Sequence, residues 1–248
     1  MKLREIAYCH YLPEKRCRRR ANTCDGYESA LRLHVIPRFG DLELDEIAHE
    51  DIQRWVDEFD LPGAAEKAYK TLRQVIRWAI RRFGVRIWDP TQGIELPEKK
   101  RVEPSTLSAE EVSVCLKGFH GDQFEPTVIL SSCLGLRPGE AYGIMWRDID
   151  MRSGAVRIQR TLQEVGGLLH VYPPKTIRSY RTVYLPRFAA VRLKAIWAQR
   201  GKPKGRVIEN SKPSQVARAI KSRMKRLSLP ICSMYGWRHT WATVAVEA

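Results

Sequence analysis

Residues 132–141 read Ser-Cys-Leu-Gly-Leu-Arg-Pro-Gly-Glu-Ala, the pattern of a glycine turn that leads into a new helix. Arg137 opens that helix, at a place where free backbone N–H groups and the helix dipole attract an anion. Glu140 follows one helical turn later and is placed to hold the guanidinium of Arg137. Taken alone, the pattern is also typical of a surface salt bridge at a helix N-terminus, which contributes little to stability.

Two more cations, Lys175 and Arg238, lie within short recognisable motifs further along the chain. Lys175 follows two prolines and lies at the turn of a predicted hairpin, where a flexible ammonium can protonate a leaving oxygen. Arg238 lies at the start of a predicted amphipathic helix near the C-terminus. Either residue by itself is also typical of a solvated surface cation.

The three cations together match the chemistry that phosphodiester cleavage requires. Charge on the non-bridging oxygens must be balanced, and the leaving 5′ oxygen needs a proton donor. Arginine suits the first task, because its planar guanidinium can bind two phosphate oxygens and stays charged at neutral pH. The three side chains therefore form a candidate phosphodiester site.

The composition favours a nucleic-acid partner. The 248 residues include 43 Lys and Arg against 28 Asp and Glu, a formal net charge of +15, and 44% of them are hydrophobic, as in a folded protein. The apolar runs are far shorter than the ~18 residues that a membrane span needs. No secretory signal follows Met1, so we expect a cytoplasmic protein with reduced cysteines. The cysteine spacing does not match a zinc site, and we expect neither a metal nor another cofactor.

Three amphipathic helices are predicted in the first part of the chain, at residues 23–39 with Thr23 as the N-cap, at 50–59 and at 64–83. The third helix carries cations opposite its apolar face: Lys67, Lys70, Arg73, Arg77, Arg81 and Arg82. A second basic cluster is expected ahead of the first helix: Lys15, Arg16, Arg18, Arg19 and Arg20. Such cations either contact phosphates or form a solvated face.

A linker rich in turn-forming and charged residues is predicted at residues 98–107, after a first domain of residues 1–97. A capping box at Ser108-Ala109-Glu110-Glu111 then begins a second domain, residues 108–248. Its pattern predicts helices at 108–118, 125–134, 138–146, 187–200, 213–227 and 237–246, and a three-stranded patch at 155–161, 167–172 and 181–185. The expected fold class is mainly α with a small β-sheet.

The order of these motifs resembles that of the tyrosine recombinases, also called phage integrases, over nearly the whole chain. The matching stretches are residues 27–40 (the opening helix of the core-binding domain), 107–112 (the entry to the catalytic domain), 132–141 with 146–150 (the first arginine), 175–185 (the lysine hairpin) and 238–243 (the second arginine). The resemblance implies an N-terminal helical, SAM-like core-binding domain followed by an α/β catalytic domain. It also implies cleavage through a 3′-phosphotyrosyl link, without ATP or a metal ion.

By this resemblance, Arg137 and Arg238 would bind the scissile phosphate and Lys175 would protonate the leaving 5′ oxygen. Glu140 would support Arg137. The family usually has histidine three residues before the second arginine, where this chain has Tyr235, a poorer proton acceptor at neutral pH. None of the residues that follow Arg238 is a tyrosine. We therefore expect a catalytic domain that is incomplete at its C-terminus, truncated before the nucleophile tyrosine, and a fragment that binds DNA without cleaving it.

The expected partner is double-stranded DNA, in the integration or recombination of a mobile element. The residues expected to contact DNA are Lys15, Arg16, Arg18, Arg19, Arg20, Lys67, Lys70, Arg73, Arg77, Arg178 and Arg181. The family implies a tetramer on DNA, whereas we expect this chain alone to be monomeric. One alternative is a naturally truncated, non-catalytic DNA-binding regulator derived from an integrase, which Tyr235 favours. The other is a helical RNA-binding or scaffold protein with a solvated basic surface.

Overall fold

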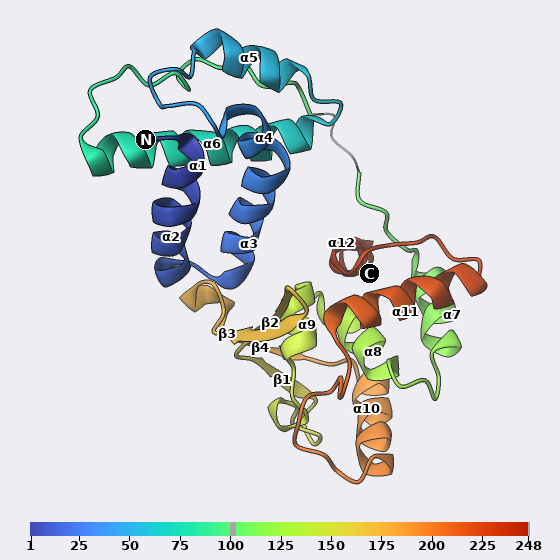
Figure 1. Cartoon of the computed structure of the whole chain (residues 1–248). Helices are drawn as coiled ribbons and strands as arrows, with labels where there is room; N and C mark the ends of the chain where they lie inside the picture. Colours follow the sequence, from blue (N-terminus) through green and yellow to red (C-terminus); the bar gives the residue numbers. More distant parts are fainter. Residues whose placement is uncertain (100–102, 248) are drawn as a thin grey trace. The chain divides into compact units, whose positions relative to one another are not determined.

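The computed structural model describes residues 1–99 and 103–247, which divide into two compact units, Met1–Val102 and Glu103–Ala248 (Figure 1). The boundary between the units falls within residues 98–107, the predicted linker. Of that linker, residues 100–102 lie outside the described residues. Each unit buries apolar side chains of its own.

The N-terminal unit is built from helical segments around a hydrophobic core. Figure 1 shows α1 and α2 beside α3 and α4, with α6 crossing them. The segments are α1 (Leu3–Glu5), the π-helical η1 (Ile6–Tyr11), α2 (Leu12–Arg18), α3 (Ala21–Ala30), the π-helical η2 (Leu31–Val35), α4 (Ile36–Phe39), α5 (His49–Asp57) and α6 (Pro62–Phe83).

The chain is helical well before the first predicted helix. Leu3, Ile6 and Tyr11 are fully buried, and they lie on one side of the helical segment that ends at Arg18. The π-helical hydrogen bonding of η1 widens the helical turn, so the apolar spacing departs from the regular 3.6-residue repeat. This departure explains why the periodicity did not predict a helix here.

The predicted basic cluster consequently lies in and after α2, and its placement ahead of the first helix is wrong. Lys15, Arg16 and Arg18 belong to α2. Arg20, and not Thr23, occupies the N-cap position of the next helix. Lys15, Arg16 and Arg18 therefore project from a folded helix, whereas Arg19 and Arg20 lie between α2 and α3.

The helix predicted at residues 64–83 is confirmed as α6, whose 22 residues span about 33 Å. Its apolar face is buried against η1, η2 and α5. Gly84 ends the helix in the left-handed conformation, with φ of 65°. Because the inner face is apolar, the cations of α6 lie toward its outer face, and Lys67, Lys70 and Arg81 are exposed.

The C-terminal unit combines helices with short strands, and each predicted helix is present. Its elements are α7 (Ala109–Gly118), α8 (Glu125–Leu134), α9 (Pro138–Gly143), η3 (Trp146–Asp148), β1 (Ala155–Ile158), β2 (Thr161–Val165), β3 (Leu168–Tyr172), η4 (Ile177–Ser179), β4 (Arg181–Tyr184), α10 (Arg187–Gln199), α11 (Pro213–Arg226) and α12 (Met234–Glu247). The capping box is confirmed: Ser108 Oγ accepts the Glu111 N–H at 3.2 Å, and Glu111 Oε2 accepts the Ser108 N–H at 2.8 Å.

The strands form two separate antiparallel pairs, so the predicted three-stranded patch is wrong. β1 pairs with β4, and β2 pairs with β3. Gly166 and Gly167 both have positive φ and close β2 and β3 into a hairpin, which leaves β4 to pair with β1. Lys175 therefore lies in the connection between two sheets and not at the tip of a hairpin.

Gly135 is the point where α12 packs against the end of α8. It ends α8 in the left-handed conformation, with φ of 55°, and a Cβ atom there would lie 2.3 Å from Cε3 of Trp241. The backbone N–H of Leu107 donates to Thr240 Oγ1 at 3.0 Å, which ties the same helix to the beginning of the unit. The position of α12 thus depends on a residue without a side chain.

We expect Gly135→Ala to destabilise the C-terminal unit more than Gly121→Ala, in urea denaturation followed by circular dichroism. Both glycines have positive φ, so each alanine incurs left-handed strain of about 1–2 kcal/mol. Only Gly135 faces an indole ring, whereas a Cβ at Gly121 meets nothing within 4 Å. The clash should add about 1–3 kcal/mol. Equal losses in the two variants would contradict close packing of Trp241 on Gly135.

Candidate phosphodiester site and nucleic-acid surfaces

Arg137 stands at the N-cap position of α9, just beyond the turn that ends α8. Its side chain is 49% exposed, and Nη1 donates a hydrogen bond to Glu140 Oε1 at 3.0 Å. Within the described part of the chain this is the one hydrogen bond of the Arg137 side chain. Because a guanidinium has five N–H donors, four remain for an anion in solution.

Glu140 is a buried carboxylate that receives hydrogen bonds from two arginines. Besides Arg137 Nη1, it accepts the Arg137 backbone N–H at 3.0 Å and two N–H groups of Arg181 at 3.1 and 2.9 Å. Burial would raise the pKa of Glu140, but the hydrogen bonds and charges of Arg181 and Arg137 outweigh it and lower that pKa. Glu140 therefore stays ionised at neutral pH and anchors the two guanidiniums.

Arg238 lies in α12 and is bonded to the turn that precedes Arg137. Its Nη1 donates to the carbonyl oxygen of Gly135 at 2.6 Å, across 103 positions of sequence. The contact places the segments of Arg137 and Arg238 side by side. Arg238 itself is partly exposed.

Tyr235 precedes Arg238 by three residues in α12, so the two side chains leave the helix on neighbouring positions of one face. The Tyr235 side chain is 57% exposed. A phenol in such a position can donate a hydrogen bond to an anion held by Arg238.

Lys175 and Arg178 lie in the segment that connects β3 to β4, and both are exposed. No hydrogen bond or ion pair of the Lys175 side chain occurs among the described residues. The segment is anchored at its end, because Arg181 begins β4 and is bonded to Glu140. The structure thus brings Arg137, Glu140 and Arg181 into contact, and it joins Lys175 to them only through the chain.

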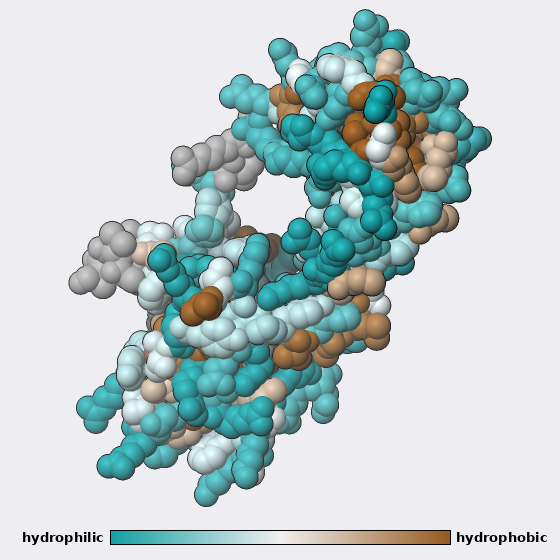
Figure 2. Space-filling view, turned by 90° about the vertical axis from the view of Figure 1, so that its left-hand side faces the viewer, coloured by the Kyte–Doolittle hydropathy of each residue, from teal (hydrophilic) through white to brown (hydrophobic). Residues whose placement is uncertain are grey.

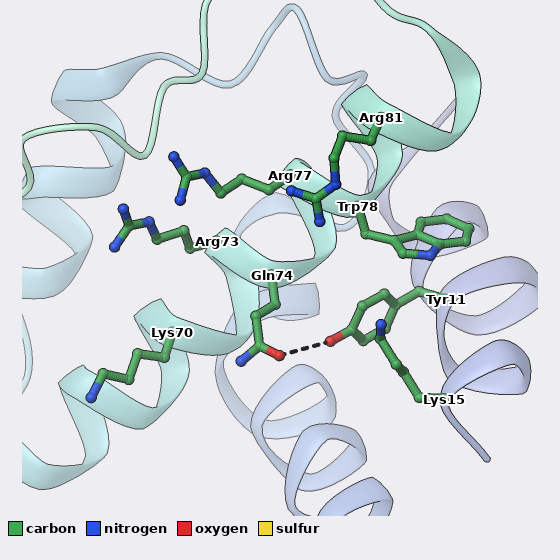
Figure 3. Close-up of a pocket in the computed structure, with 8 residues that line it drawn as sticks. All are labelled: Tyr11, Lys15, Lys70, Arg73, Gln74, Arg77, Trp78 and Arg81. Carbon is green, nitrogen blue, oxygen red and sulfur yellow. Dashed lines mark hydrogen bonds between the residues drawn. The ribbon is translucent and has the colours of Figure 1, made fainter. Parts of the chain in front are cut away.

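A basic pocket lies on the N-terminal unit, between η1 with α2 and the outer face of α6 (Figure 3). It has a volume of about 370 Å³ and is lined by Tyr11, Lys15, Lys70, Arg73, Gln74, Arg77, Trp78 and Arg81. Figure 3 shows the Arg73 and Arg77 side chains extending in the same direction from α6. The pocket therefore concentrates positive charge at one place on the unit.

Some of the pocket's cations are held by neighbouring groups. Arg77 Nε donates to the buried Asp89 at 2.8 Å, and the Lys70 ammonium lies 2.6 Å from Glu66. By contrast, Arg73 and Arg81 form no ion pair among the described residues, and Arg73 Nε is buried without a hydrogen-bond partner. These two guanidiniums are the ones best placed to bind an anion.

The other predicted cations of the N-terminal unit are spread out. Arg16 pairs with Glu28 at 2.6 Å and Arg18 with Glu14 at 3.4 Å, whereas Lys15 joins the pocket. Arg19 is exposed and Arg20 is partly buried. Lys67 is exposed on α6 and does not line the pocket.

The sequence analysis missed the cations of α11. Val216, Ile220 and Met224 are buried along one face of this helix. The opposite face carries exposed cations: Arg218, Lys221, Lys225 and Arg226. Their three- and four-residue spacing was a sufficient signal, because the helix itself was predicted.

Neither a metal cluster nor a membrane span is found in residues 1–99 and 103–247. No three His, Cys, Asp or Glu side chains there are grouped so that they could hold a metal ion. None of the helices in those residues combines the length and apolar character that crossing a bilayer demands.

Comparisons with known proteins agree on one family. Residues 5–59 match the model "Phage integrase, N-terminal SAM-like domain". A "Tyrosine recombinase XerC-like" protein of Caldanaerobacter subterraneus subsp. tengcongensis is 26% identical over 233 residues, 79% of this chain and 59% of that protein. The integrase of Mycobacterium phage FRAT1 is 26% identical over 91% of this chain and 71% of its own length. The chain therefore spans under two thirds of the XerC-like relative.

Solved structures share the fold. The Tn1549 transposon integrase in complex with a circular intermediate DNA superposes with a TM-score of 0.76 at 17% identity, over 100% of this chain and 87% of that one. A lambda integrase dimer bound to a COC′ core site gives a TM-score of 0.74 at 17% identity, over 100% of this chain and 71% of that one. Both likenesses support a helical N-terminal domain followed by an α/β domain.

Replacing Glu140 should make the free energy of unfolding less dependent on pH in the acid range. Because the folded-state pKa of Glu140 is lowered, its contribution is complete above the ordinary value of 4.5 and is lost as pH falls through the folded-state value. We expect Glu140→Gln to cost about 3 kcal/mol of unfolding free energy at pH 7, and this difference to shrink below pH 4.5. Urea denaturation at several pH values measures it. The exposed Glu209→Gln is the matched control, and an equal loss there would contradict the anchoring role.

Proposed function

The chain belongs to the phage integrase family, also called tyrosine recombinases, and from this membership we propose that it acts on double-stranded DNA in site-specific recombination and integration. The Tn1549 and lambda integrases in the solved structures are bound to DNA, which supports the same class of partner here.

The observation that carries the proposal is the hydrogen bond from Arg238 Nη1 to Gly135 O at 2.6 Å. It holds the second arginine beside the segment of Arg137, and Glu140 anchors the Arg137 side chain at 3.0 Å. Two exposed or partly exposed guanidiniums held in this way can bind one phosphate group through several charged hydrogen bonds. A scaffold protein would have no use for such an arrangement.

We propose that Arg137 and Arg238 bind the scissile phosphate and that Lys175 donates the proton to the leaving 5′ oxygen. The exposed position of Lys175 on a connecting segment suits this task, because the ammonium can reach a bound backbone without breaking an ion pair. Cleavage in the family uses a tyrosine that follows the second arginine, and no tyrosine follows Arg238 among these 248 residues. These residues alone would therefore bind DNA and leave it uncut.

The rest of the binding energy would come from cationic surfaces on the two units. On the N-terminal unit, the basic pocket around Arg73 and Arg81 would contact phosphates. On the C-terminal unit, the cations on the outer face of α11 would do so. Figure 2 shows hydrophilic residues over much of the visible surface. Such surfaces follow the phosphate backbone and give affinity with little dependence on base sequence.

A second candidate is a non-catalytic DNA-binding regulator related to integrases. It is favoured by Tyr235, which stands where the family usually has histidine. A phenol at this position can donate a hydrogen bond, but it lacks the basic ring nitrogen with which a histidine accepts a proton. Binding of DNA by the same arginines is common to both candidates.

Affinity for a labelled DNA duplex of mixed sequence should fall steeply with salt. For about eight phosphate contacts, the logarithm of the association constant should fall against the logarithm of salt concentration with a slope near −7. Fluorescence anisotropy titrations over a series of salt concentrations measure it. A flat response would contradict the DNA-binding proposal.

The basic pocket should account for part of that slope. The double variant Arg73→Ala with Arg81→Ala should flatten it by about 2. The double variant Arg4→Ala with Arg54→Ala removes the same charge from cations that already pair with Asp41 and Asp51, and it should change the slope little. Equal effects would mean that net charge alone, and not the pocket, governs binding.

We infer that these 248 residues are monomeric in solution and that a protein containing them assembles as a tetramer on DNA. One lambda integrase structure is a tetramer bound to a Holliday junction, which supports assembly on DNA for that protein. Sedimentation velocity of the chain without DNA should give one species with the mass of 28.6 kDa. A stable tetramer in the absence of DNA would overturn the inference.

A further inference from the structure

Arg181 differs from the other cations of the site in what its guanidinium contacts. Its Nη1 lies 3.1 Å from Glu140 Oε1 and its Nη2 lies 2.9 Å from Glu140 Oε2, so both terminal nitrogens face one carboxylate. Nη1 also donates to Ser179 O at 3.3 Å. The Arg181 side chain is 27% exposed, compared with 49% for Arg137.

This geometry occupies the Nη1–Nη2 edge of the guanidinium, through which an arginine can bind a phosphate end-on. A phosphate could take that edge only if Glu140 were released, which would leave a carboxylate that is 4% exposed without two of its hydrogen bonds. Arg137 faces the opposite situation, because a single N–H of its side chain is used by Glu140. The two arginines that share Glu140 therefore have different tasks.

Charge leads to the same division. The single negative charge of Glu140 lies against two guanidiniums, so the group of three carries a net charge of +1. Because Arg181 takes two hydrogen bonds and Arg137 one, the free positive charge is presented mainly by Arg137. Without Arg181, Glu140 would neutralise Arg137 and reduce its attraction for an anion.

Arg181 also connects the Lys175 segment to the Arg137 turn, between which the described residues show no other side-chain hydrogen bond. Its backbone is held in the β1–β4 pair opposite Ile158, and its side chain reaches α9 through Glu140. It closes the segment that carries Lys175, within which Thr176 Oγ1 and Ser179 Oγ lie 2.9 Å apart. One side chain thus fixes the end of the Lys175 segment to the Arg137 turn.

We propose that Arg181 is a positioning residue that orients Arg137 through Glu140 and does not itself contact DNA. The proposal rests on the proposed function, since it concerns the way the same site meets a phosphate. It replaces the expectation from sequence that Arg181 binds DNA directly.

A double-mutant cycle on DNA affinity tests the proposal. The proteins are the wild-type chain, Arg137→Ala, Arg181→Ala and the double variant, each titrated with the mixed-sequence duplex at several salt concentrations. Arg137→Ala should weaken binding about tenfold and flatten the salt slope by about 1. Arg181→Ala should give most of the same loss, and the double variant should be no weaker than Arg137→Ala. If Arg181 contacts DNA directly, the losses instead multiply to about a hundredfold and the slope flattens by about 2, which would overturn the proposal.

The conservative variant Arg181→Lys separates positioning from folding. Lysine keeps the charge but cannot bond both carboxylate oxygens as a planar fork. We therefore expect Arg181→Lys to weaken DNA binding less than Arg181→Ala does. When Arg137 is already alanine, Arg181→Lys should cause no further loss of affinity. Circular dichroism and urea denaturation show whether each variant is folded. If Arg181→Ala fails to fold, the cycle is run with Arg181→Lys, and independent effects of the two substitutions would overturn the proposal.

A measurement without DNA distinguishes this proposal from the proposed function. In the free protein, the guanidinium N–H resonance of Arg137 should shift or broaden in Arg181→Lys, while that of Arg238, which is bonded to Gly135 O, should stay in place. An unchanged Arg137 resonance would overturn the positioning role. A shifted resonance together with a flat salt response of the wild-type chain would uphold the positioning role and reject the DNA-binding proposal.

Discussion

The buried carboxylate of Glu140 constrains the arrangement of the whole candidate site. A carboxylate that is 4% exposed needs hydrogen-bond donors on all sides, and here they come from the Arg137 backbone and from two guanidiniums. For these donors to reach the carboxylate, the first turn of α9 and the first residue of β4 must stay close together. The helix that begins after Arg137 is therefore locked to the strand that follows the Lys175 segment.

Gly135 provides the second fixed point of the site. Its left-handed conformation turns the chain from α8 into α9, its missing side chain admits the Trp241 ring, and its carbonyl oxygen accepts from Arg238. Any side chain at this position would disturb all three features at once. The turn therefore couples helix termination to the placement of a cation that lies 103 positions away in the sequence.

Buried ion pairs hold the scaffold around these two points. Arg192 of α10 makes two hydrogen bonds, at 2.6 and 2.8 Å, to Glu125 at the start of α8. Burial would raise the pKa of Glu125, but the bonds from Arg192 and from the Gly121 N–H outweigh it and lower that pKa. Arg160 likewise pairs with the buried Asp148. Removal of one partner would leave a buried charge, so such pairs favour one arrangement of the helices over others.

The cationic surfaces follow from helix amphipathicity. Each of α6 and α11 buries an apolar face and thereby presents the cations of the opposite face to solvent. On α6 the neighbouring η1 and α2 add Tyr11 and Lys15, and the flat cationic face becomes a pocket. The same pairing of helices orients Arg73 and Arg81, whose guanidiniums have no carboxylate partner among the described residues.

Local patterns in the sequence were enough to predict most helices, the Ser108 capping box and the Glu140 support of Arg137, because helical periodicity, capping and i,i+3 contacts involve residues that are near one another in the chain. The π-helical turns of η1 escaped prediction because they break that periodicity. Strand pairing, the Glu140 contact of Arg181 and the Gly135 contact of Arg238 were decided by the tertiary structure alone. Each joins distant residues through a backbone or side-chain hydrogen bond, and no local repeat specifies which donor meets which acceptor across the fold.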